Sequence, residues 1–284
     1  MNTIDTLIDL ALKEDGAFND ITSKEFVPED KKAKAVLVAN KDGVLAGVDV
    51  FIEVFKTLDD RCKVTIEKKD GDFLKKGNKI LEITGFARTI LLGERTALNF
   101  LQYMSGIATF TNVFVKAVDN NKIKIYDTRK ILPGYREFAK YAVRCGGGTN
   151  HRIGLSDMVL IKDNHLKLIK DLTSAISNFK KKYKDIKVEV ECESLCEVKN
   201  ALVAKADIIM LDNTTPKTAG EMIDVIRKNS TKDYKPEIEI SGNVDFQAIK
   251  EFAKLDIDRI SIGMITHSAP VLDVSLEVTI NCDI

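Results

Sequence analysis

Alternating apolar and polar residues mark the first part of the chain, up to about residue 105. The alternation is clear over residues 35–47 and 64–85, and Asp-Gly pairs interrupt it at positions 42–43 and 70–71. A period of two is typical of half-buried β-strands, and Asp-Gly pairs are typical of tight turns. This part therefore predicts a sheet of short strands.

Two segments of the same part have helical spacing instead. Residues 1–15 place Ile4, Leu7 and Ala11 on one face of an acidic, amphipathic helix. Residues 88–106 repeat apolar side chains at the same interval and predict a second helix. A secretory signal would need a basic start and a longer apolar stretch, so we expect none.

From about residue 120 the pattern changes to short apolar strands that alternate with helices. Helical segments such as residues 171–184 and 219–229 separate most of the strands. Strand–helix alternation with right-handed crossovers gives a parallel sheet, and six or more such units can close into an α/β barrel. The strand-like segments are residues 122–130, 157–165, 187–193, 207–213, 237–243 and 258–264.

Polar residues or glycines stand at the end of each of these strands. The carboxyl ends of barrel strands meet at one mouth, where barrel enzymes hold their active sites. We therefore expect cations, carboxylates and glycines from six strands to face one site. The residues concerned are Asp127, Thr128, Arg129, Lys130, Lys162, Asp163, Asn164, His165, Glu189, Glu191, Asp212, Asn213, Ser241, Gly242, Asn243 and Gly263.

The overall charge limits the partners of this site. Lys and Arg total 43 and Asp and Glu total 43, so the 284-residue chain has no global field that would attract nucleic acid. No apolar run approaches the roughly 20 residues that a membrane-spanning helix needs. Five scattered cysteines, an odd number, fit reduced thiols in a cytoplasmic protein better than a disulfide framework.

A local excess of positive charge lies between Asp127 and His165. This segment contains seven Lys or Arg against four Asp or Glu, and three consecutive glycines occupy positions 146–148. Arg and Lys bind carboxylates and phosphates, and glycine lets backbone N–H groups approach them. The segment therefore predicts a polyanionic small-molecule substrate. The candidate ligands are Arg129, Lys130, His151, Arg152 and Lys162, and His165 could be either a ligand or a structural hydrogen-bonding residue.

The remaining candidates each allow more than one interpretation. Glu191 and Asp212 end neighbouring strands and could hold Mg²⁺ together with substrate phosphates, hold sugar hydroxyls, or balance the nearby cations. The segment Ser241-Gly242-Asn243 and Gly263 could bind a monophosphate through backbone N–H groups or could form ordinary turns. His267 follows the last of these glycines and could line the same pocket.

Together these motifs resemble the quinolinate phosphoribosyltransferase family, also called nicotinate-nucleotide pyrophosphorylase (carboxylating). The resemblance runs through essentially the whole chain, and it is specific because the motifs form a long ordered set. The matching stretches are ERTALNFLQYMSGIAT at 94–109, DTRK and PGYR at 127–136, KYAVRCGGGTNHRIGL at 140–155, MVLIKDNH at 158–165, VEVEC at 188–192, ADIIMLDN at 206–213, EISGN at 239–243, and ISIGMITHSAPVLDVSL at 260–276.

The resemblance implies an enzyme that transfers phosphoribosyl from phosphoribosyl pyrophosphate to quinolinate with decarboxylation. Nicotinate mononucleotide, pyrophosphate and carbon dioxide would be its products, in de novo NAD synthesis, with Mg²⁺ as the cofactor. The implied fold is an N-terminal α/β sandwich over residues 1–108, joined by the tail 270–284, and a somewhat irregular α/β barrel of parallel strands over 109–269. A homodimer or larger assembly is also implied, in which the sandwich of one subunit covers the barrel mouth of the other.

Site roles follow from the same resemblance, position by position. Arg129, Lys130, His151, Arg152 and Lys162, with Thr128 beside them, would surround the carboxylates of quinolinate and the pyrophosphate. Glu191 and Asp212 would lie near the ribose and the metal, and Lys130, Glu191 and Asp212 would be the catalytic residues. Ser241, Gly242, Asn243 and Gly263 would hold the 5′-phosphate with His267 close by, and Arg95 would reach the neighbouring subunit's site.

Two positions depart from the family pattern. Ile131 stands where a Thr is common, and Phe138-Ala139 replaces a Leu-Glu pair, which removes a partner for a local cation. The alternatives are a molybdate-transport-linked branch of the same fold, an enzyme that uses nicotinate, and a non-catalytic anion-binding barrel or carrier protein. The strand end at residues 162–165 argues against the molybdate-linked branch. Nicotinate has a single carboxylate, which requires fewer cations than this segment provides.

Overall fold

The computed structural model describes residues 3–118, 122–242 and 244–279, and the chain divides into two compact units. The first unit comprises Met1–Asn112, Ile131–Gly147 and Ile265–Ile284, and the second comprises Val113–Lys130 and Gly148–Met264. The expected domain boundary at residue 108 falls within helix α4 (Ala87–Val118), near Asn112, where the first segment of the first unit ends. Residues 131–147, which were expected in the barrel, belong to the first unit.

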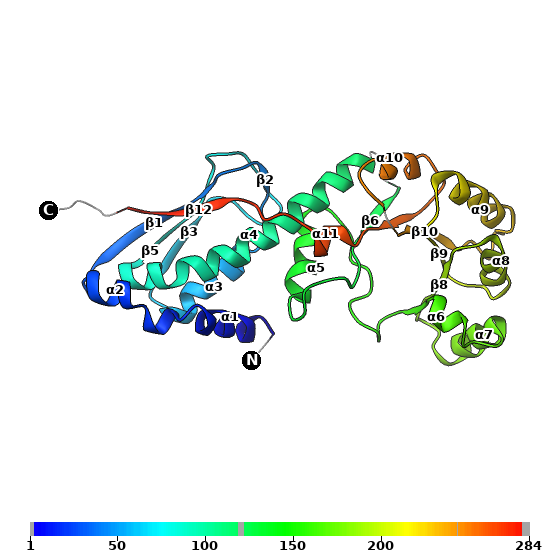
Figure 1. Ribbon diagram of the computed structural model, residues 1–284, viewed down its shortest axis with the longest axis horizontal. Helices are drawn as coiled ribbons and strands as arrows, with labels where there is room; N and C mark the ends of the chain where they lie inside the picture. Colours follow the sequence, from blue (N-terminus) through cyan, green and yellow to red (C-terminus); the bar gives the residue numbers. More distant parts are fainter. Residues whose placement is uncertain (1–2, 119–121, 243, 280–284) are drawn as a thin grey trace. The chain divides into compact units, whose positions relative to one another are not determined.

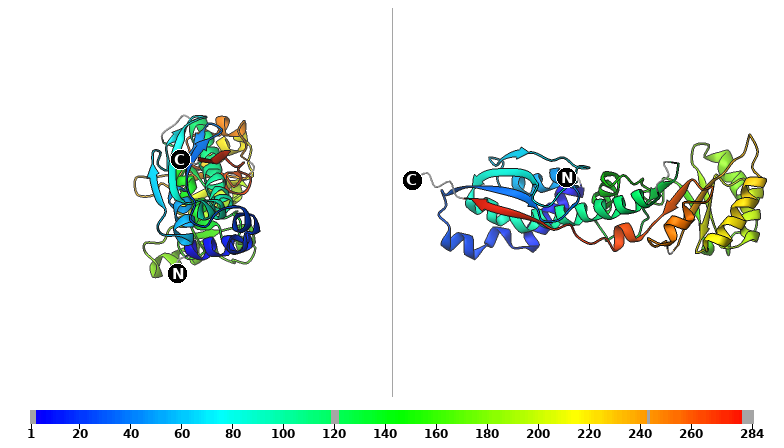
Figure 2. Two further views of the ribbon diagram at one scale, coloured as in Figure 1. Left: turned by 90° about the vertical axis from the view of Figure 1, so that its left-hand side faces the viewer. Right: turned by 90° about the horizontal axis from the view of Figure 1, so that it is seen from above.

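The first unit is built on a four-stranded antiparallel sheet in the order β12–β1–β5–β3. Every second residue of β1 is buried from Ala33 to Ala39, so one face of the strand packs inwards as the alternating pattern predicts. Helices α3 and α4 lie over one face of this sheet in Figures 1 and 2. The strands are β1 (Lys32–Ala39), β3 (Lys63–Ile66), β5 (Lys79–Phe86) and β12 (Val274–Thr279).

Helices and a separate pair of short strands supply the rest of this unit. Both predicted helices are present, and the second one extends well beyond its predicted end at residue 106. In α3 the rings of Phe51 and Phe55 lie 5.2 Å apart and are fully buried, which makes them part of the core of the unit. The helices are α1 (Thr3–Glu14), η1 (Ala17–Asn19), α2 (Ile21–Phe26), α3 (Val48–Leu58), α4, α5 (Arg136–Cys145) and α11 (Met264–His267).

The strands on either side of each Asp-Gly turn pair with strands elsewhere in the sequence. Strand β2 (Gly43–Val44) follows β1 but pairs with β4 (Phe73–Leu74). The turn carboxylate of Asp70 accepts the N–H groups of Gly47 at 3.0 Å and Val48 at 3.1 Å, at the start of α3. Asp70 therefore caps a helix that is remote in sequence, and the turn does not join two paired strands.

The second unit contains the parallel α/β sheet that the strand–helix alternation predicts. Its six strands lie in the order β6–β11–β10–β9–β8–β7, so β11, the last of them in the sequence, pairs with β6, the first. Thr149 extends the β6 edge through a single parallel bridge to Tyr126. Among the described residues no ladder joins this edge to β7, so the barrel is incompletely closed. The strands are β6 (Lys124–Tyr126), β7 (Val159–Ile161), β8 (Val188–Cys192), β9 (Ile208–Asp212), β10 (Glu237–Ser241) and β11 (Arg259–Ser261).

Helices α7, α8 and α9 of this unit begin at side-chain caps. Ser194 accepts the N–H of Glu197 at 3.3 Å, and the Glu197 carboxylate accepts the N–H of Ser194 at 3.0 Å. This reciprocal pair satisfies N–H groups that a helix start leaves without partners. Thr215 caps α9 by accepting the N–H of Thr218, just before Pro216. The helices are α6 (Asp163–Leu166), α7 (Leu172–Lys182), α8 (Leu195–Val203), α9 (Pro216–Lys228) and α10 (Ala248–Phe252).

Candidate functional site

A cavity of about 310 Å³ opens at the carboxyl ends of the parallel strands in the second unit. Among its lining residues, Leu160, Met210 and Ser261 are the ones that the sequence did not suggest. The structure thus brings together the cations that the sequence nominated and places one acid and two serines beside them. The lining residues are Thr128, Arg129, Lys130, His151, Arg152, Leu160, Lys162, Met210, Asp212, Ser241 and Ser261.

Strand alternation explains which side chains reach this cavity. Met210 and Asp212 stand two residues apart on β9, and both line the cavity. Leu211, which lies between them, is fully buried. Side chains two apart in a strand point to the same face, so the aliphatic residue between them is directed to the opposite face of the sheet.

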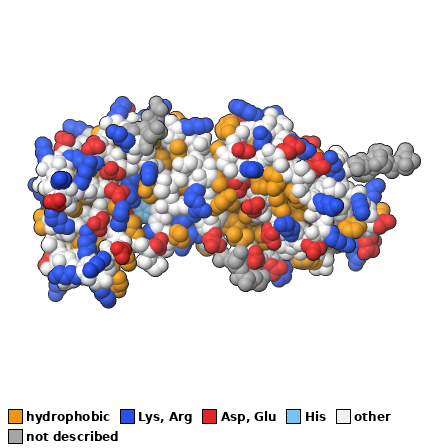
Figure 3. Space-filling model, turned by 180° about the vertical axis from the view of Figure 1, so that it is seen from behind, with side chains coloured by type: hydrophobic (Ala, Val, Ile, Leu, Met, Phe, Trp, Pro, Cys, Tyr) orange, Lys and Arg blue, Asp and Glu red, His pale blue; other side chains and the backbone are white. Residues whose placement is uncertain are grey.

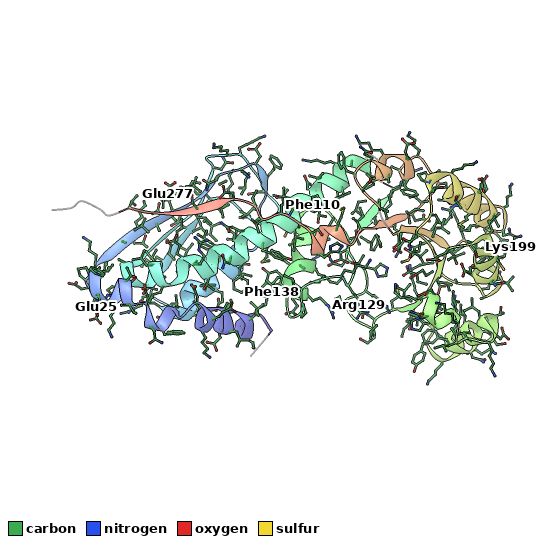
Figure 4. All side chains as sticks on the ribbon, viewed as in Figure 1. Glu25, Phe110, Arg129, Phe138, Lys199 and Glu277 are labelled. Atoms are coloured by element: carbon green, nitrogen blue, oxygen red, sulfur yellow. The ribbon has the colours of Figure 1, made fainter. Side chains whose placement is uncertain are left out.

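Arg129 and Arg152 interact as like charges in this site. Arg129 is labelled in Figure 4 on the segment that follows β6, and Arg152 follows the glycine run. Burial lowers the pKa of Arg152, the charge of Arg129 lowers it further, and the carboxylates of Glu189 and Asp157 act in the opposite direction. Two neighbouring guanidinium groups form a site suited to a multiply charged anion. This positive charge is local, since both signs of charge are interspersed over the face seen in Figure 3.

Asp157 holds the loop that follows Arg152. Its carboxylate accepts the N–H of Ile153 at 2.5 Å and the N–H of Gly154 at 2.9 Å. Burial raises the pKa of Asp157, but these backbone donors outweigh it, and the pKa lies below the ordinary value. Arg152 Nη1 also donates to the carbonyl of Met158 at 3.1 Å, so both ends of the loop are fixed beside the cavity.

Lys162 and Glu191 form an ion pair between neighbouring strands. Lys162 Nζ donates to Glu191 Oε2 at 2.9 Å, and the side chains are 48% and 8% exposed. Burial raises the pKa of Glu191, Lys162 lowers it, and Asp212 raises it again, so that the pKa lies above its ordinary value. In this pair the lysine is half-exposed and lines the cavity, whereas the glutamate is largely buried.

Three carboxylates at this end of the strands could hold a metal ion. Oxygen atoms of Glu191, Glu193 and Asp212 all lie within 4.8 Å of one another. Mg²⁺ prefers oxygen ligands and is usually bound by one or two carboxylates together with substrate phosphates. The donor set fits such an ion. Glu193, which the sequence did not suggest, is the exposed member of the three.

His151 lies at the inner end of the cavity and contacts protein groups through both ring nitrogens. The N–H of Arg152 donates to His151 Nδ1 at 2.9 Å, and His151 Nε2 lies 3.2 Å from Glu189 Oε2 and 3.5 Å from Glu239 Oε1. Burial lowers the pKa of His151, but the two carboxylates raise it more, so the pKa lies above the ordinary value. The backbone N–H of His151 donates to buried Asp127 at 2.7 Å.

A group of buried ionisable residues lies close to His151. Glu189 and Glu239 are fully buried, and Arg259 is 7% exposed. Ser261 Oγ donates to Glu239 Oε1 at 2.5 Å, and Arg259 Nη1 lies 3.5 Å from Glu239 Oε2. Arg259 also pairs with Glu237. Burial and the charge of Glu239 raise the pKa of Glu189, because two neighbouring carboxylates disfavour a second negative charge.

The turn after β10 is shaped by a glycine. Gly242 has a φ of +109°, and a Cβ there would lie 2.7 Å from the backbone nitrogen of Asn213. Ser241, just before it, lines both the cavity of about 310 Å³ described above and a smaller one of about 120 Å³. The strand ends of β9 and β10 are therefore in close contact at the expected phosphate site, and Asn243 lies outside the described residues.

Four other candidates lie away from the lining of this cavity. Arg95 is exposed on α4 in the first unit, and His267, also exposed, lies in α11 with its Nδ1 2.7 Å from Ser268 Oγ. Gly263 lies two residues after the end of β11 and is half-buried. His165 Nδ1 accepts the N–H of Lys162 at 3.0 Å, which gives this histidine a structural contact at the end of β7.

The buried layer of Glu239, Arg259 and Ser261 was missed at the sequence level. A usable pattern existed, because VEVEC, EIEIS and RIS alternate polar and aliphatic residues within strands of the barrel. Inward positions of such barrels are normally filled by branched aliphatic side chains. Charged residues at these inward positions therefore indicate a barrel interior that is not purely aliphatic. Once the strands are assigned, the two-residue period of strand side chains is enough to identify these positions.

Comparison with known proteins agrees with the fold. Residues 107–277 match the family model for the quinolinate phosphoribosyl transferase C-terminal domain, and residues 20–105 match that for its N-terminal domain. A probable nicotinate-nucleotide pyrophosphorylase [carboxylating] of Methanocaldococcus jannaschii is 41% identical over 272 residues, with 94% of each chain covered. The corresponding Bacillus subtilis protein is 38% identical over 269 residues, which cover 94% of this chain and 91% of that protein.

Solved structures give the same result. NadC from Streptococcus pyogenes is 41% identical, with a TM-score of 0.89 and coverage of 97% of this chain and 96% of that one. The nicotinate-nucleotide pyrophosphorylase of Francisella tularensis is 40% identical, with a TM-score of 0.89 over 98% and 96%. Within the described residues, no helix combines the length and apolar character needed to cross a membrane. Two family models that together cover most of the sequence, and relatives of similar length, show that the chain belongs to the quinolinate phosphoribosyl transferase family.

Proposed function

We propose that this protein transfers the phosphoribosyl group of phosphoribosyl pyrophosphate to quinolinate and releases pyrophosphate and carbon dioxide. The product would be nicotinate mononucleotide, an intermediate of de novo NAD synthesis. One observation carries the proposal: Arg129, Lys130, Arg152 and Lys162 share a single cavity with Asp212 in a chain of this family. Relatives named as carboxylating nicotinate-nucleotide pyrophosphorylases support it.

The chemistry of the reaction matches these groups. The pyridine nitrogen of quinolinate is already a nucleophile, so no general base is required. The demanding steps are the binding of two carboxylates beside a pyrophosphate and the stabilisation of a cation-like ribosyl group as pyrophosphate leaves. Fixed cations such as Arg129 and Arg152 serve the first, and a carboxylate such as Asp212 serves the second. After transfer, the positive ring nitrogen withdraws electrons from the adjacent carbon, and carbon dioxide leaves from that position.

Mg²⁺ is the cofactor that we propose for this site. Glu191 and Asp212 would hold it together with the phosphate oxygens of the substrate, and exposed Glu193 stands close enough to contribute. A bound Mg²⁺ would neutralise negative charge on the pyrophosphate. Lys162 would orient Glu191 through their 2.9 Å hydrogen bond.

We further propose a homodimer in which Arg95 of one subunit completes the site of the other. Arg95 is exposed on α4, and Leu91 and Asn99, one helical turn away on either side, are exposed as well. An exposed strip of mixed apolar and polar residues is suited to a protein interface. The described cysteines are unpaired thiols, which fits the cytoplasmic location that we propose for the enzyme.

Turnover of the purified protein tests this function directly. The protein would be incubated with phosphoribosyl pyrophosphate, Mg²⁺ and either quinolinate or nicotinate, and nucleotide and carbon dioxide would be quantified. We expect equal amounts of nucleotide and carbon dioxide from quinolinate and no product from nicotinate. Product from nicotinate alone, or no product from either acid, would overturn the proposal, and the second result would favour the molybdate-linked branch.

A further inference from the structure

We propose that buried Glu189 and Glu239 are positioning residues, which hold the His151 ring so that Arg152 is fixed for binding the dicarboxylate substrate. The two glutamates belong to strands β8 and β10 and touch no exposed surface. They act on the substrate only through His151 and Arg152, which line the cavity. This inference rests on the proposed function and adds the groups that prepare its dicarboxylate site.

Two kinds of contact act on the His151 ring: a hydrogen bond at Nδ1 and the close approach of two carboxylates to Nε2. Nδ1 accepts the backbone N–H of Arg152 at 2.9 Å, and Nε2 faces Glu189 at 3.2 Å and Glu239 at 3.5 Å. Nε2 carries a hydrogen both in the neutral ring that accepts at Nδ1 and in the imidazolium ring. The carboxylates can therefore accept from Nε2 in either protonation state. A ring held in this way fixes the backbone at Arg152, from which the guanidinium group projects into the cavity.

Glu189 also offsets the repulsion between the two cations that line the cavity. Arg129 and Arg152 repel each other, and the charge of Glu189 acts in the opposite direction on Arg152. Because Glu189 is fully buried, water screens its charge poorly, and its effect on a cation of the cavity is larger than that of an exposed carboxylate.

Stability of the fold does not account for this arrangement. Two adjacent buried carboxylates are costly, and aliphatic residues fill such inward positions in ordinary barrels. Arg259 and Ser261 compensate Glu239, whereas the contact that the structure shows for Glu189 is with His151. Because the described partner of Glu189 lines the cavity, this carboxylate contributes to the arrangement of the cavity more directly than to the stability of the fold.

The test compares Glu189→Gln with Glu237→Gln in the full-length protein. Gln retains the shape of Glu and removes its charge. Glu237 is a matched control, because it lies on β10 two residues from Glu239 and pairs with the same Arg259. The control reports the loss of a half-buried charge that shares Arg259 with this layer, without direct removal of a partner of His151.

Three readouts separate positioning from folding. Histidine ring signals in ¹⁵N-labelled protein, assigned with His165→Asn and His267→Asn, report the Nε2 hydrogen of His151 without substrate. We expect that signal to move upfield in Glu189→Gln, because a neutral amide accepts a weaker hydrogen bond than a carboxylate. Calorimetric Kd and steady-state KM for quinolinate should both rise by about tenfold or more in Glu189→Gln. The KM for phosphoribosyl pyrophosphate should stay within about twofold.

The control variant fixes the interpretation of these results. Glu237→Gln should lower the melting temperature while the ring signal and the quinolinate Kd keep their wild-type values. An unchanged ring signal in Glu189→Gln, an equal loss of quinolinate affinity in both variants, or a selective rise in the KM for phosphoribosyl pyrophosphate would each overturn the proposal. Absence of turnover in the wild-type protein would overturn the proposed function. It would leave the test of His151 positioning intact, because the ring signal is measured without substrate.

Discussion

Lys162 Nζ donates a hydrogen bond of 2.9 Å to Glu191 Oε2 and thereby joins the ends of two neighbouring parallel strands. The lysine is half-exposed and the glutamate is nearly buried. A cation that faces the cavity is thus anchored to a carboxylate of the possible metal site. The two substrates that we propose would meet at this pair, because one carries carboxylates and the other carries the metal-bound pyrophosphate.

Replacement of Lys162 by Met should raise the KM for quinolinate by about tenfold or more, because a cation for its carboxylates is lost. The melting temperature should change little, since the lysine is half-exposed. Steady-state kinetics and thermal unfolding would measure both effects. Lys167→Met is the matched control, because this exposed lysine pairs with Asp163 four residues away. Equal kinetics for Lys162→Met and wild type would remove Lys162 from the substrate site.

Replacement of Gly242 by Ala should raise the KM for phosphoribosyl pyrophosphate. The new Cβ would collide with the backbone of Asn213 at a residue whose φ is +109°, so the turn at the expected phosphate site would have to shift. Gly77→Ala provides a control, because Gly77 also has a positive φ but has open space around it. Both variants should lose stability, and only Gly242→Ala should change the kinetics. Unaltered KM values in Gly242→Ala would exclude a phosphate role for this turn.

The loop of residues 153–157 should loosen in acid. The pKa of Asp157 is lower in the folded protein than in the unfolded chain, so its contribution to stability is full above the ordinary carboxyl pKa. That contribution is lost as the pH falls through the lower, folded-state pKa. Hydrogen exchange at the amides of Ile153 and Gly154, corrected for intrinsic rates, should show less protection near pH 3 than near pH 6. Asp157→Asn should lack this pH dependence, and equal slopes in both proteins would contradict the prediction.

Removal of divalent metal should abolish turnover. Excess chelator would take Mg²⁺ from the carboxylates and from the pyrophosphate substrate, and added Mg²⁺ should restore the rate. Glu191→Gln should require more Mg²⁺ for half-maximal activity than wild type, whereas Glu221→Gln, on the exposed side of α9, should not. Full activity in chelator would rule out the metal role of Glu191 and Asp212.

Mixing two inactive variants should restore part of the activity if subunits share sites. Arg95→Ala and Arg129→Ala proteins, dissociated and reassociated together, would form heterodimers in which one site of the two is intact. Random pairing makes half of the dimers heterodimers, so about a quarter of the wild-type rate is expected. Each variant carried through the same treatment alone serves as the control. Rates in the mixture no higher than in these controls would contradict a shared site.

Local patterns predicted the second unit well. The six parallel strands and the positions of Arg129, Lys162 and Asp212 follow from alternation and from the rule that strand ends gather at one mouth. The role of His165 could not be predicted, because a histidine donates, accepts or binds substrate according to its neighbours. The structure shows that its Nδ1 accepts a backbone N–H.

Pairings between distant segments could not be read from the sequence. β1 pairs with β12, and Lys34 lies opposite Thr279, so no local pattern identifies the partner. The same holds for Asp70, whose carboxylate caps α3 from 22 and 23 residues away. Glu239 and the burial of Glu189 were missed for a different reason, since carboxylates are rarely buried and the ordinary expectation places them in water.

The pairing of β12 with β1 has a consequence for the order of events during synthesis. Strand β1 occupies residues 32–39, and its neighbour on one side is made only when residues 274–279 have left the ribosome. Until then that edge of the sheet exposes N–H and C=O groups to other nascent chains. The second unit, whose residues end at 264, can fold while the first still lacks this strand. The emerging protein is therefore most prone to association late in translation, and chaperones that bind exposed strand edges would act at this stage.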